Sequence, residues 1–166
     1  MGQREDESFR EFVAAGTAPL LRVAYLLMGD LGQAEDLLQN ALVKTYLAWG
    51  RIRDPGAVHA YVRRVLVTSA TSWWRRRAAH EVPVAAPPEL VAPDFAGRQA
   101  EAETMRRLLL TLPAKQRAVL VLRFYEDLTE AEVADVLGVT RGTVSRYVTR
   151  GLAALRARLE EGELVR

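Results

Sequence analysis

The sequence predicts an all-α protein made of two small helical domains joined by a proline-rich linker. Leu, Ala, Arg and Glu dominate both ends of the chain and alternating runs of β-branched residues are few, which favours helices over strands. Four of the seven prolines fall between residues 78 and 97, where they break helices and favour extended chain. We therefore expect one domain over residues 1–77, a linker over 78–98 and a second domain over 99–166.

The first domain contains a helix that is expected to begin at Asp30 and to end at Gly50. Gln33 follows Asp30 by three residues, a capping-box arrangement that satisfies backbone N–H groups at a helix start. Apolar spacing of three and four residues predicts a buried stripe of Ala34, Leu37, Leu38, Ala41, Leu42, Thr45 and Trp49. The outward side then carries Glu35, Asp36, Gln39, Asn40 and Lys44.

A second helix is expected to begin after Asp54, with Pro55 in the first helical position, where the missing N–H has no consequence. Its core stripe is predicted to be Val58, Tyr61, Val62, Val65, Leu66 and Ser69. Arg63, Val67 and Trp74 fall near the opposite side, so aliphatic, aromatic and basic side chains share one outward face. We expect Trp73 to lie in the core and Trp74 on this outward face, which is suited to a binding partner rather than to solvent.

The stretch from Leu128 to Gly151, "LTEAEVADVLGVTRGTVSRYVTRG", has the pattern of a helix-turn-helix. Thr129 with Glu132 predicts a capping box, and Thr140 is the expected N-cap of the second helix. A small residue, a glycine and an apolar residue stand at the positions where the two helices approach, turn and lock together: Ala134, Gly138 and Val144.

The second helix of this motif offers polar side chains on its exposed N-terminal face. Every charge between residues 138 and 158 is an arginine. The residues expected to meet base edges and phosphates are Arg141, Thr143, Ser145, Arg146 and Arg150. An ordinary helical hairpin with a solvated basic face is the alternative, and the combination of caps, spacing and an acid-free helix favours DNA binding.

Composition excludes several classes of site. The chain has no cysteine and two histidines, which is too few for a metal cluster, so we expect neither a metal nor a cofactor. Glu35 and Asp36 are adjacent and point about 100° apart on a helix, and no glycine-rich phosphate loop or Ser-His-Asp set accompanies them. We expect no enzyme activity and no small-molecule substrate.

No apolar run approaches the roughly 20 residues that span a bilayer, and the start, "MGQREDESFREF", lacks the apolar segment of a signal peptide. We therefore expect a cytoplasmic protein without membrane insertion.

Three stretches together resemble the extracytoplasmic-function (ECF) sigma factors of bacterial RNA polymerase, particularly their actinobacterial SigE-like group. "DLGQAEDLLQNALVKTYLAW" resembles sigma region 2.2, "AYVRRVLVTSATSWWRRR" resembles regions 2.3 and 2.4, and the segment from "LPAKQRAVLVLRFY" through the helix-turn-helix resembles region 4. The resemblance covers nearly the whole chain and keeps the family's order of motifs.

The resemblance implies a function in transcription initiation and assigns a role to each surface. Region 2.2 implies binding to core RNA polymerase through Asp36, Gln39 and Asn40. Regions 2.3 and 2.4 imply capture of the melted, single-stranded minus-ten element by the loop 52–57 and by Arg63, Val67, Thr68, Thr71, Trp74, Arg75 and Arg77. Region 4 implies reading of the minus-thirty-five element as duplex promoter DNA, and the family commonly has an anti-sigma factor as a further partner.

The sequence departs from the family pattern at several positions. Thr68 and Ser72 stand where the family often has Asn and Asp, and Ser145, Arg146 and Tyr147 replace Lys, Ser and Arg. Promoter sequence is therefore not transferred from relatives. A stand-alone helix-turn-helix regulator is the alternative function, and it would bind duplex DNA without polymerase.

Overall fold

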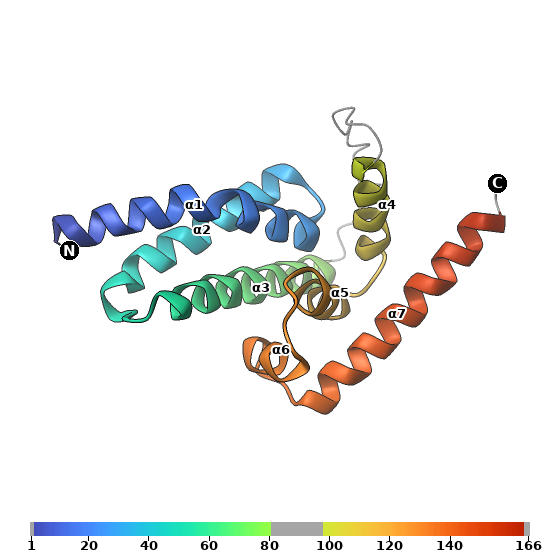
Figure 1. The fold of residues 1–166 in the computed structure, drawn as a ribbon. Helices are drawn as coiled ribbons and strands as arrows, with labels where there is room; N and C mark the ends of the chain where they lie inside the picture. Colours follow the sequence, from blue (N-terminus) through green and yellow to red (C-terminus); the bar gives the residue numbers. More distant parts are fainter. Residues whose placement is uncertain (1, 81–97, 165–166) are drawn as a thin grey trace.

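The computed structural model describes residues 2–80 and 98–164, and over these residues the protein is helical with no strand. The linker expected over 78–98 falls for the most part outside the described residues. Figure 1 shows three helices of the first half lying along one another, with the helices of the second half against one side of them. The helices are α1 (Gln3–Met28), α2 (Leu31–Ala48), α3 (Pro55–Ala79), α4 (Arg98–Leu110), α5 (Ala114–Leu120), α6 (Glu130–Leu137) and α7 (Arg141–Leu164), with short turns η1 (Trp49–Arg51) and η2 (Val121–Tyr125).

The predicted starts of α2 and α3 are confirmed. The backbone N–H of Gln33 donates to the Asp30 carboxylate at 2.9 Å, and that of Gly56 donates to the Asp54 carboxylate at 3.0 Å. Most of the predicted α2 stripe is buried, whereas Leu42 and Trp49 are half-buried. In the predicted α3 stripe Val58, Val62 and Leu66 are buried, whereas Tyr61, Val65 and Ser69 are half-buried.

The long helix α1 precedes the elements expected from the sequence. By length and composition alone it is apolar enough to cross a membrane. Its C-terminal turns instead supply core residues that pack with α2 and α3, namely Val23, Ala24, Leu27 and Met28. Gly29 ends the helix in the left-handed conformation (φ +77°).

The second half forms the predicted helix-turn-helix from α6 and α7. Thr129 and Glu132 form the expected reciprocal capping box, with distances of 3.2 and 3.1 Å. Gly138 adopts φ +66° at the turn, and the Thr143 N–H donates to the Thr140 hydroxyl at 3.2 Å. The helix-turn-helix prediction is thus confirmed in its caps and in its turn.

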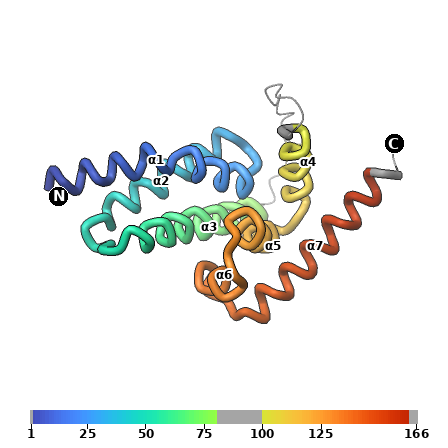
Figure 2. Tube along the Cα trace, viewed as in Figure 1, coloured from blue at the N-terminus to red at the C-terminus, as the bar shows by residue number. Residues whose placement is uncertain are grey.

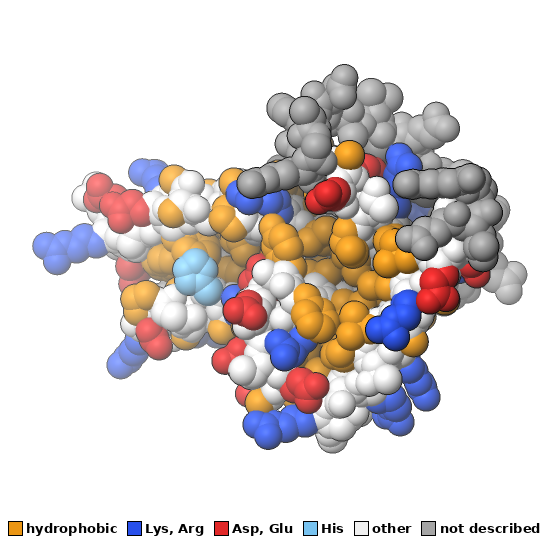
Figure 3. All heavy atoms as spheres, turned by 45° about the vertical axis from the view of Figure 1, so that its right-hand side comes forward, with side chains coloured by type: hydrophobic (Ala, Val, Ile, Leu, Met, Phe, Trp, Pro, Cys, Tyr) orange, Lys and Arg blue, Asp and Glu red, His pale blue; other side chains and the backbone are white. Residues whose placement is uncertain are grey.

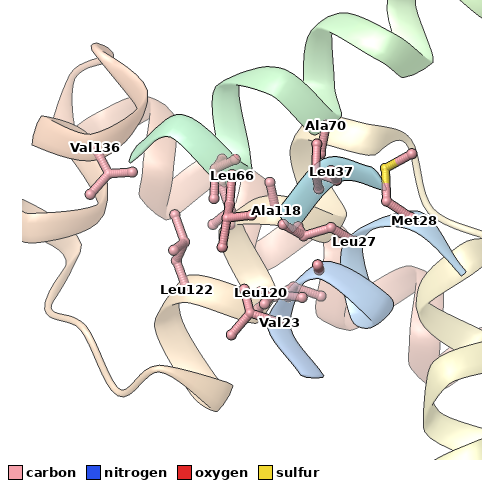
Figure 4. Packing of buried hydrophobic residues seen from close by; sticks show 14 of the residues in the cluster. Val23, Leu27, Met28, Leu37, Leu66, Ala70, Ala118, Leu120, Leu122 and Val136 are labelled. Atoms are coloured by element: carbon pink, nitrogen blue, oxygen red, sulfur yellow. The ribbon is translucent and has the colours of Figure 1, made fainter. Parts of the chain in front are cut away.

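Both halves contribute to one continuous core. Figure 4 shows Leu66 of α3 grouped with Ala118 and Leu122 of the second half, and Leu120 near Val23 of α1. The helices α5 and α6 contact α3, and α4 contacts α1. The termini nevertheless lie at opposite ends of the molecule (Figure 2).

A buried arginine ties α4 to the end of α1. Arg106 is 3% exposed and donates from Nη1 to the backbone carbonyl of Gly29 at 2.7 Å. Its guanidinium also pairs with Glu103 and lies 5.0 Å from the ring centroid of Tyr25. Pairing with Arg106 lowers the pKa of Glu103, so this carboxylate is charged over a wide pH range.

The packing of α4, η2 and α7 leaves an apolar groove on the surface. Figure 3 shows apolar side chains gathered in the middle of this face of the molecule. The groove is lined by Leu26, Ala102, Met105, Leu109, Leu120, Val121, Phe124, Tyr125, Leu152 and Leu155.

Candidate nucleic-acid interface

The N-terminal part of α7 presents the predicted basic surface to solvent. Arg141, Ser145, Arg146 and Arg150 are exposed. Thr143 is half-buried, and its hydroxyl lies 3.0 Å from that of Thr140, so part of its hydrogen-bonding capacity is used by the cap. Four of the five predicted residues are therefore available to a partner without any rearrangement.

Two neighbouring positions on α7 pack against the core instead of facing solvent. Tyr147 is half-buried and packs against the core, so it is held within the protein rather than displayed like the arginines. Gly151 is buried, and a Cβ atom there would lie 2.9 Å from Leu120 Cδ1. Glycine allows α7 to approach α5 closely, where a larger residue would require Leu120 to move.

The predicted outward face of α3 is covered by the second half of the chain. Val67 was expected on the outside and is fully buried, which corrects that expectation. The reason is that α5 and α6 pack across α3 from the side opposite to α1 and α2. The face is apolar and basic as predicted, and its partner in this structure is the protein itself.

Charged groups connect the covered face to the second half. Arg63 donates from Nε to the Glu126 carboxylate at 3.0 Å, and its Nη2 lies 3.0 Å from the same oxygen. Arg64 donates from Nη2 to the backbone carbonyl of Asp135 at 2.9 Å. The two arginines thus bind acceptors supplied by the end of η2 and by α6.

Trp74 is half-buried rather than fully outward. Its indole N–H donates to the carbonyl of Leu27 at 3.1 Å, and the guanidinium of Arg117 from α5 lies 4.6 Å from the ring centroid. Trp73, expected in the core, is also half-buried and packs edge-on against Trp74 at 4.8 Å.

Arg117 is an unusual residue to find under this surface. It is 2% exposed, and burial lowers its pKa to about 10. Its Nε has no hydrogen-bond partner within the part of the chain that the structure describes. A buried guanidinium group with an unmet donor disfavours this packing, whereas stacking on Trp74 favours it.

The remaining predicted minus-ten residues differ in their accessibility. The hydroxyls of Thr68 and Thr71 donate to carbonyls of their own helix, those of Arg64 and Val67, at 2.7 and 2.9 Å. Arg75 is exposed, and Arg77 stacks on Trp73 with its guanidinium carbon 5.1 Å from the centroid.

A cleft beside the loop 52–57 contains aromatic residues that the sequence patterns did not identify. The Phe12 ring lies 5.4 Å from both Trp49 and His59, and all three residues line the cleft. Arg63 and Glu126 line the same cleft. The only signal for this cleft in the sequence is that aromatic residues occur in α1, in η1 and near the start of α3. The fold is needed to show that they meet.

The outward side of α2 carries the predicted polymerase-binding residues. Asp36, Gln39 and Asn40 are all exposed, as expected. Apolar side chains are also exposed on this helix: Leu31 in its first turn, and Val43 at 58% and Leu47 at 70% in its C-terminal half, of which the last two lie four residues apart. Exposed aliphatic side chains next to polar ones are typical of a protein-binding surface, and this spacing places Val43 and Leu47 on one side of α2.

Within the described ranges, no group of three His, Asp or Glu side chains is arranged to hold a metal ion.

Comparison with known proteins agrees with the geometry of both halves. The family model for Sigma-70 region 2 matches residues 13–80, and the model for Sigma-70, region 4 matches residues 108–157. The chain belongs to the sigma-70 family. Its matched regions contain the covered face of α3 and the exposed end of α7, respectively.

The relatives of this sigma factor include actinobacterial members of the ECF group. It is 40% identical to the RNA polymerase sigma-E factor of Streptomyces avermitilis, over 99% of this chain and 92% of that protein. It is 36% identical to the ECF RNA polymerase sigma factor SigM of Mycobacterium tuberculosis, over 82% of this chain and 69% of that protein. The chain is thus an actinobacterial ECF sigma factor, a protein that directs RNA polymerase to promoters.

Solved structures share the fold. The sigma factor RpoE from Bartonella quintana, solved with the anti-sigma factor NepR, superposes with a TM-score of 0.77 at 21% identity, covering 93% of this chain and 98% of that one. CnrH, solved with the cytosolic domain of CnrY, gives a TM-score of 0.67 at 22% identity, covering 94% and 90%.

Proposed function

We propose that this sigma factor divides promoter recognition between two surfaces, with the α7 surface reading duplex DNA and the α3 surface holding melted DNA. The exposed, acid-free N-terminal part of α7 carries the proposal, because it is the second helix of the helix-turn-helix formed with α6. We assign residues 1–77 to polymerase and minus-ten binding, 78–98 to the linker and 99–166 to minus-thirty-five binding. The helix α3 continues two residues beyond this first boundary, to Ala79.

The α7 surface suits the major groove. Arginine guanidinium groups pair with the acceptor edge of guanine or with phosphate, and the hydroxyl of Ser145 can donate or accept. Arg141 in the first turn lies close to the phosphate backbone when such a helix enters the groove by its N-terminus. Arg146 and Arg150 are spaced by one turn and therefore lie on one side of α7.

The α3 surface suits an unpaired strand. Aromatic rings accept any base by stacking, and arginines bind the phosphates between bases. Trp74 and the cleft formed by Phe12, Trp49 and His59 offer stacking surfaces, and Arg63 and Arg75 offer charge. This surface is used only after α5 and α6 move away from α3.

The α2 surface is proposed to bind core polymerase. Asp36, Gln39 and Asn40 supply polar contacts, and Val43 and Leu47 add apolar area beside them. The acidic first half is consistent with a basic protein partner rather than DNA, since residues 1–50 carry more acids than bases.

The chain itself is proposed to be non-catalytic, with nucleotidyl transfer performed by the polymerase, and to act in the cytoplasm where the polymerase lies. RpoE from Bartonella quintana was solved with an anti-sigma factor, and we propose that a partner of this class also restrains this chain.

A stand-alone regulator is the alternative, because a helix-turn-helix by itself also fits that function. Run-off transcription with purified core polymerase and genomic promoter fragments separates the two. A sigma factor gives discrete transcripts that require the protein and shows little duplex binding when polymerase is absent. A protein that binds a duplex operator tightly on its own and gives no transcripts would overturn the sigma assignment.

A further inference from the structure

A cleft between α3 and α5 is lined by three cationic side chains and by no carboxylate among the described residues. Arg75 comes from α3, and Lys115 and Arg117 come from α5. The cleft beside the loop 52–57 and the cleft between α2 and α3 both contain carboxylates. The positive charge of this α3–α5 cleft is therefore not balanced by the residues that line it.

Arg117 is the side chain of this cleft that most lacks an anion. It is 2% exposed, and burial alone lowers its pKa to about 10. Its Nε has no hydrogen-bond partner within residues 2–80 and 98–164. The ion pairs in those ranges are made by other arginines: Arg63, Arg106, Arg107 and Arg158.

A buried cation without an anionic partner is strongly unfavourable. The Trp74 ring, 4.6 Å from the Arg117 guanidinium, attracts the cation but carries no charge to balance it. An anion bound in the cleft would supply the missing charge and would accept hydrogen bonds from the guanidinium.

The other two cations can reach the same anion from two helices. Lys115 and Arg75 are both exposed, so their charged ends are available to a ligand in the α3–α5 cleft. Arginine matches phosphate oxygens with parallel N–H groups, and lysine binds phosphate as a flexible point charge. Ser72 and Gln116 add neutral hydrogen-bonding groups to the lining.

The remainder of the α3–α5 cleft is suited to a ring rather than to a bare ion. Tyr147 lines it together with the apolar side chains of Leu110, Leu112 and Pro113. Its volume is about 810 Å³, which is within the range of small-molecule sites. Aromatic and apolar side chains bind the face of a nucleobase, while the cations bind its phosphates.

We infer that the α3–α5 cleft binds a phosphate-bearing nucleotide, with Arg117, Lys115 and Arg75 holding the phosphates and Tyr147 beside the base. The nucleotide is a ligand and undergoes no reaction. This site goes beyond the proposed promoter function, and neither polymerase nor DNA is needed to observe it. Because both halves of the chain hold the nucleotide, its binding stabilises their packing.

Isothermal titration calorimetry of the full chain with ATP and GTP tests the site, in about 0.15 M salt so that exposed charges are screened. Adenosine and guanosine test the need for phosphate, and pyrophosphate tests the need for the base. We expect one nucleotide per chain, no binding of the nucleosides and weaker binding of pyrophosphate. Absence of binding by both nucleotides would overturn the inference, and pyrophosphate binding as tight as theirs would overturn the nucleotide as ligand.

Lys115→Glu tests whether the nucleotide binds in this cleft. Arg156→Glu is the matched control, because it makes the same charge change at an exposed position of α7 that does not line the cleft. We expect Lys115→Glu to weaken nucleotide binding about tenfold or more, as for loss of a hydrogen bond between charged groups. Equal affinity of the two variants would place the nucleotide elsewhere and overturn the site.

Arg117→Met tests the buried cation. Replacing an unpaired buried charge by an apolar side chain of similar length should leave the melting temperature close to that of wild type, while the rise in melting temperature on adding nucleotide should disappear. A variant that keeps this nucleotide-dependent rise would limit Arg117 to packing on Trp74 and overturn its role. Lys115 is exposed, so the Lys115→Glu result decides the site even where Arg117→Met does not fold.

Discussion

The two helices that we propose to bind DNA differ in what covers them. The start of α7 is open, with Arg146 and Arg150 in solvent, whereas the corresponding face of α3 lies beneath α5 and α6 with Val67 fully buried. The difference follows from composition. The helix α7 has one apolar side, which the helix-turn-helix uses, whereas α3 has apolar residues on two sides and buries both. A helix with two apolar sides can exchange one partner for another, and we expect α3 to do so.

The largest effect is expected for Asp36→Arg, because we propose that both DNA surfaces operate only in the complex with polymerase. A cation placed against the partner's positive groups should cost about 2–5 kcal/mol of core binding. Stability should change little, since Asp36 is exposed. Fluorescence anisotropy with labelled protein and core polymerase measures the affinity, and circular dichroism measures folding.

Glu7→Arg makes the same charge change on an exposed site of α1 and should retain core binding. Wild-type affinity in a folded Asp36→Arg protein would remove Asp36 from the interface.

Arg106→Leu should lower the free energy of unfolding by about 2–4 kcal/mol, because it leaves the Gly29 carbonyl without its donor and Glu103 with only the exposed Arg107 as a partner. The contact between Arg106 and Gly29 joins α4 to the end of α1, far along the chain from α3. It helps to hold the second half of the chain against α3. Arg107→Leu is the matched control, because it removes only the exposed one of the two arginines that pair with Glu103, with a side chain 66% exposed. Urea denaturation compares them, and equal stability of the two variants would contradict the anchoring role.

Trp74→Ala should reduce promoter opening about tenfold, since stacking on an aromatic ring contributes about 1–3 kcal/mol per base. Initial duplex binding should be affected less, because that step uses α7. Permanganate footprinting of the holoenzyme on its promoter reports unpaired thymines. Normal opening by a folded variant would assign Trp74 to packing alone, through Leu27 and Arg117.

Arg146→Ala and Arg150→Ala should each cost about 1–3 kcal/mol of holoenzyme affinity if they contact bases, or reduce the salt dependence if they contact phosphates. Arg158→Ala, farther along α7 and also exposed, is the control. Binding titrated against salt separates the two types of contact. Unchanged affinity and salt slope in both variants would remove them from the DNA surface.

The smallest effect is expected on the pH dependence of stability in acid. Because Arg106 lowers the pKa of Glu103, the folded state binds fewer protons than the unfolded state. The contribution of this pair is present above the ordinary carboxyl pKa of about 4 and is lost as pH falls through the lower folded value. Below about pH 4 the free energy of unfolding of Arg106→Leu should therefore fall less steeply than that of wild type. An equally steep fall in both proteins would contradict the contribution of the Arg106–Glu103 pair.

Local signals in the sequence predicted what depends on local physics. Asp30, Asp54, Thr129 and Thr140 cap helices through backbone groups two or three residues away, so spacing suffices to find them. The covering of Val67 depends on residues of α5 and α6 far along the chain, which apolar spacing within α3 does not reveal. Periodicity identified a second apolar side on α3 without identifying its partner.

The same reason explains the missed parts of the site. Phe12 and His59 belong to different helices and meet only after α1 packs on α3. Leu47 lies outside the apolar stripe and is recognisable as a surface residue only from its exposure. The predicted surface on α7 needed no such long-range information, because one motif contains it.

The contrast between the open α7 and the covered α3 is tested most directly by energy transfer between dyes on Ala78→Cys and Lys115→Cys. Both positions are exposed and line the same cleft, and they belong to α3 and α5, one on each half. The account predicts one high-transfer state for free protein and a lower-transfer state when core polymerase and promoter are added and permanganate shows melting. Unchanged energy transfer in a complex that melts the promoter would contradict it, because α3 would then bind DNA without being uncovered.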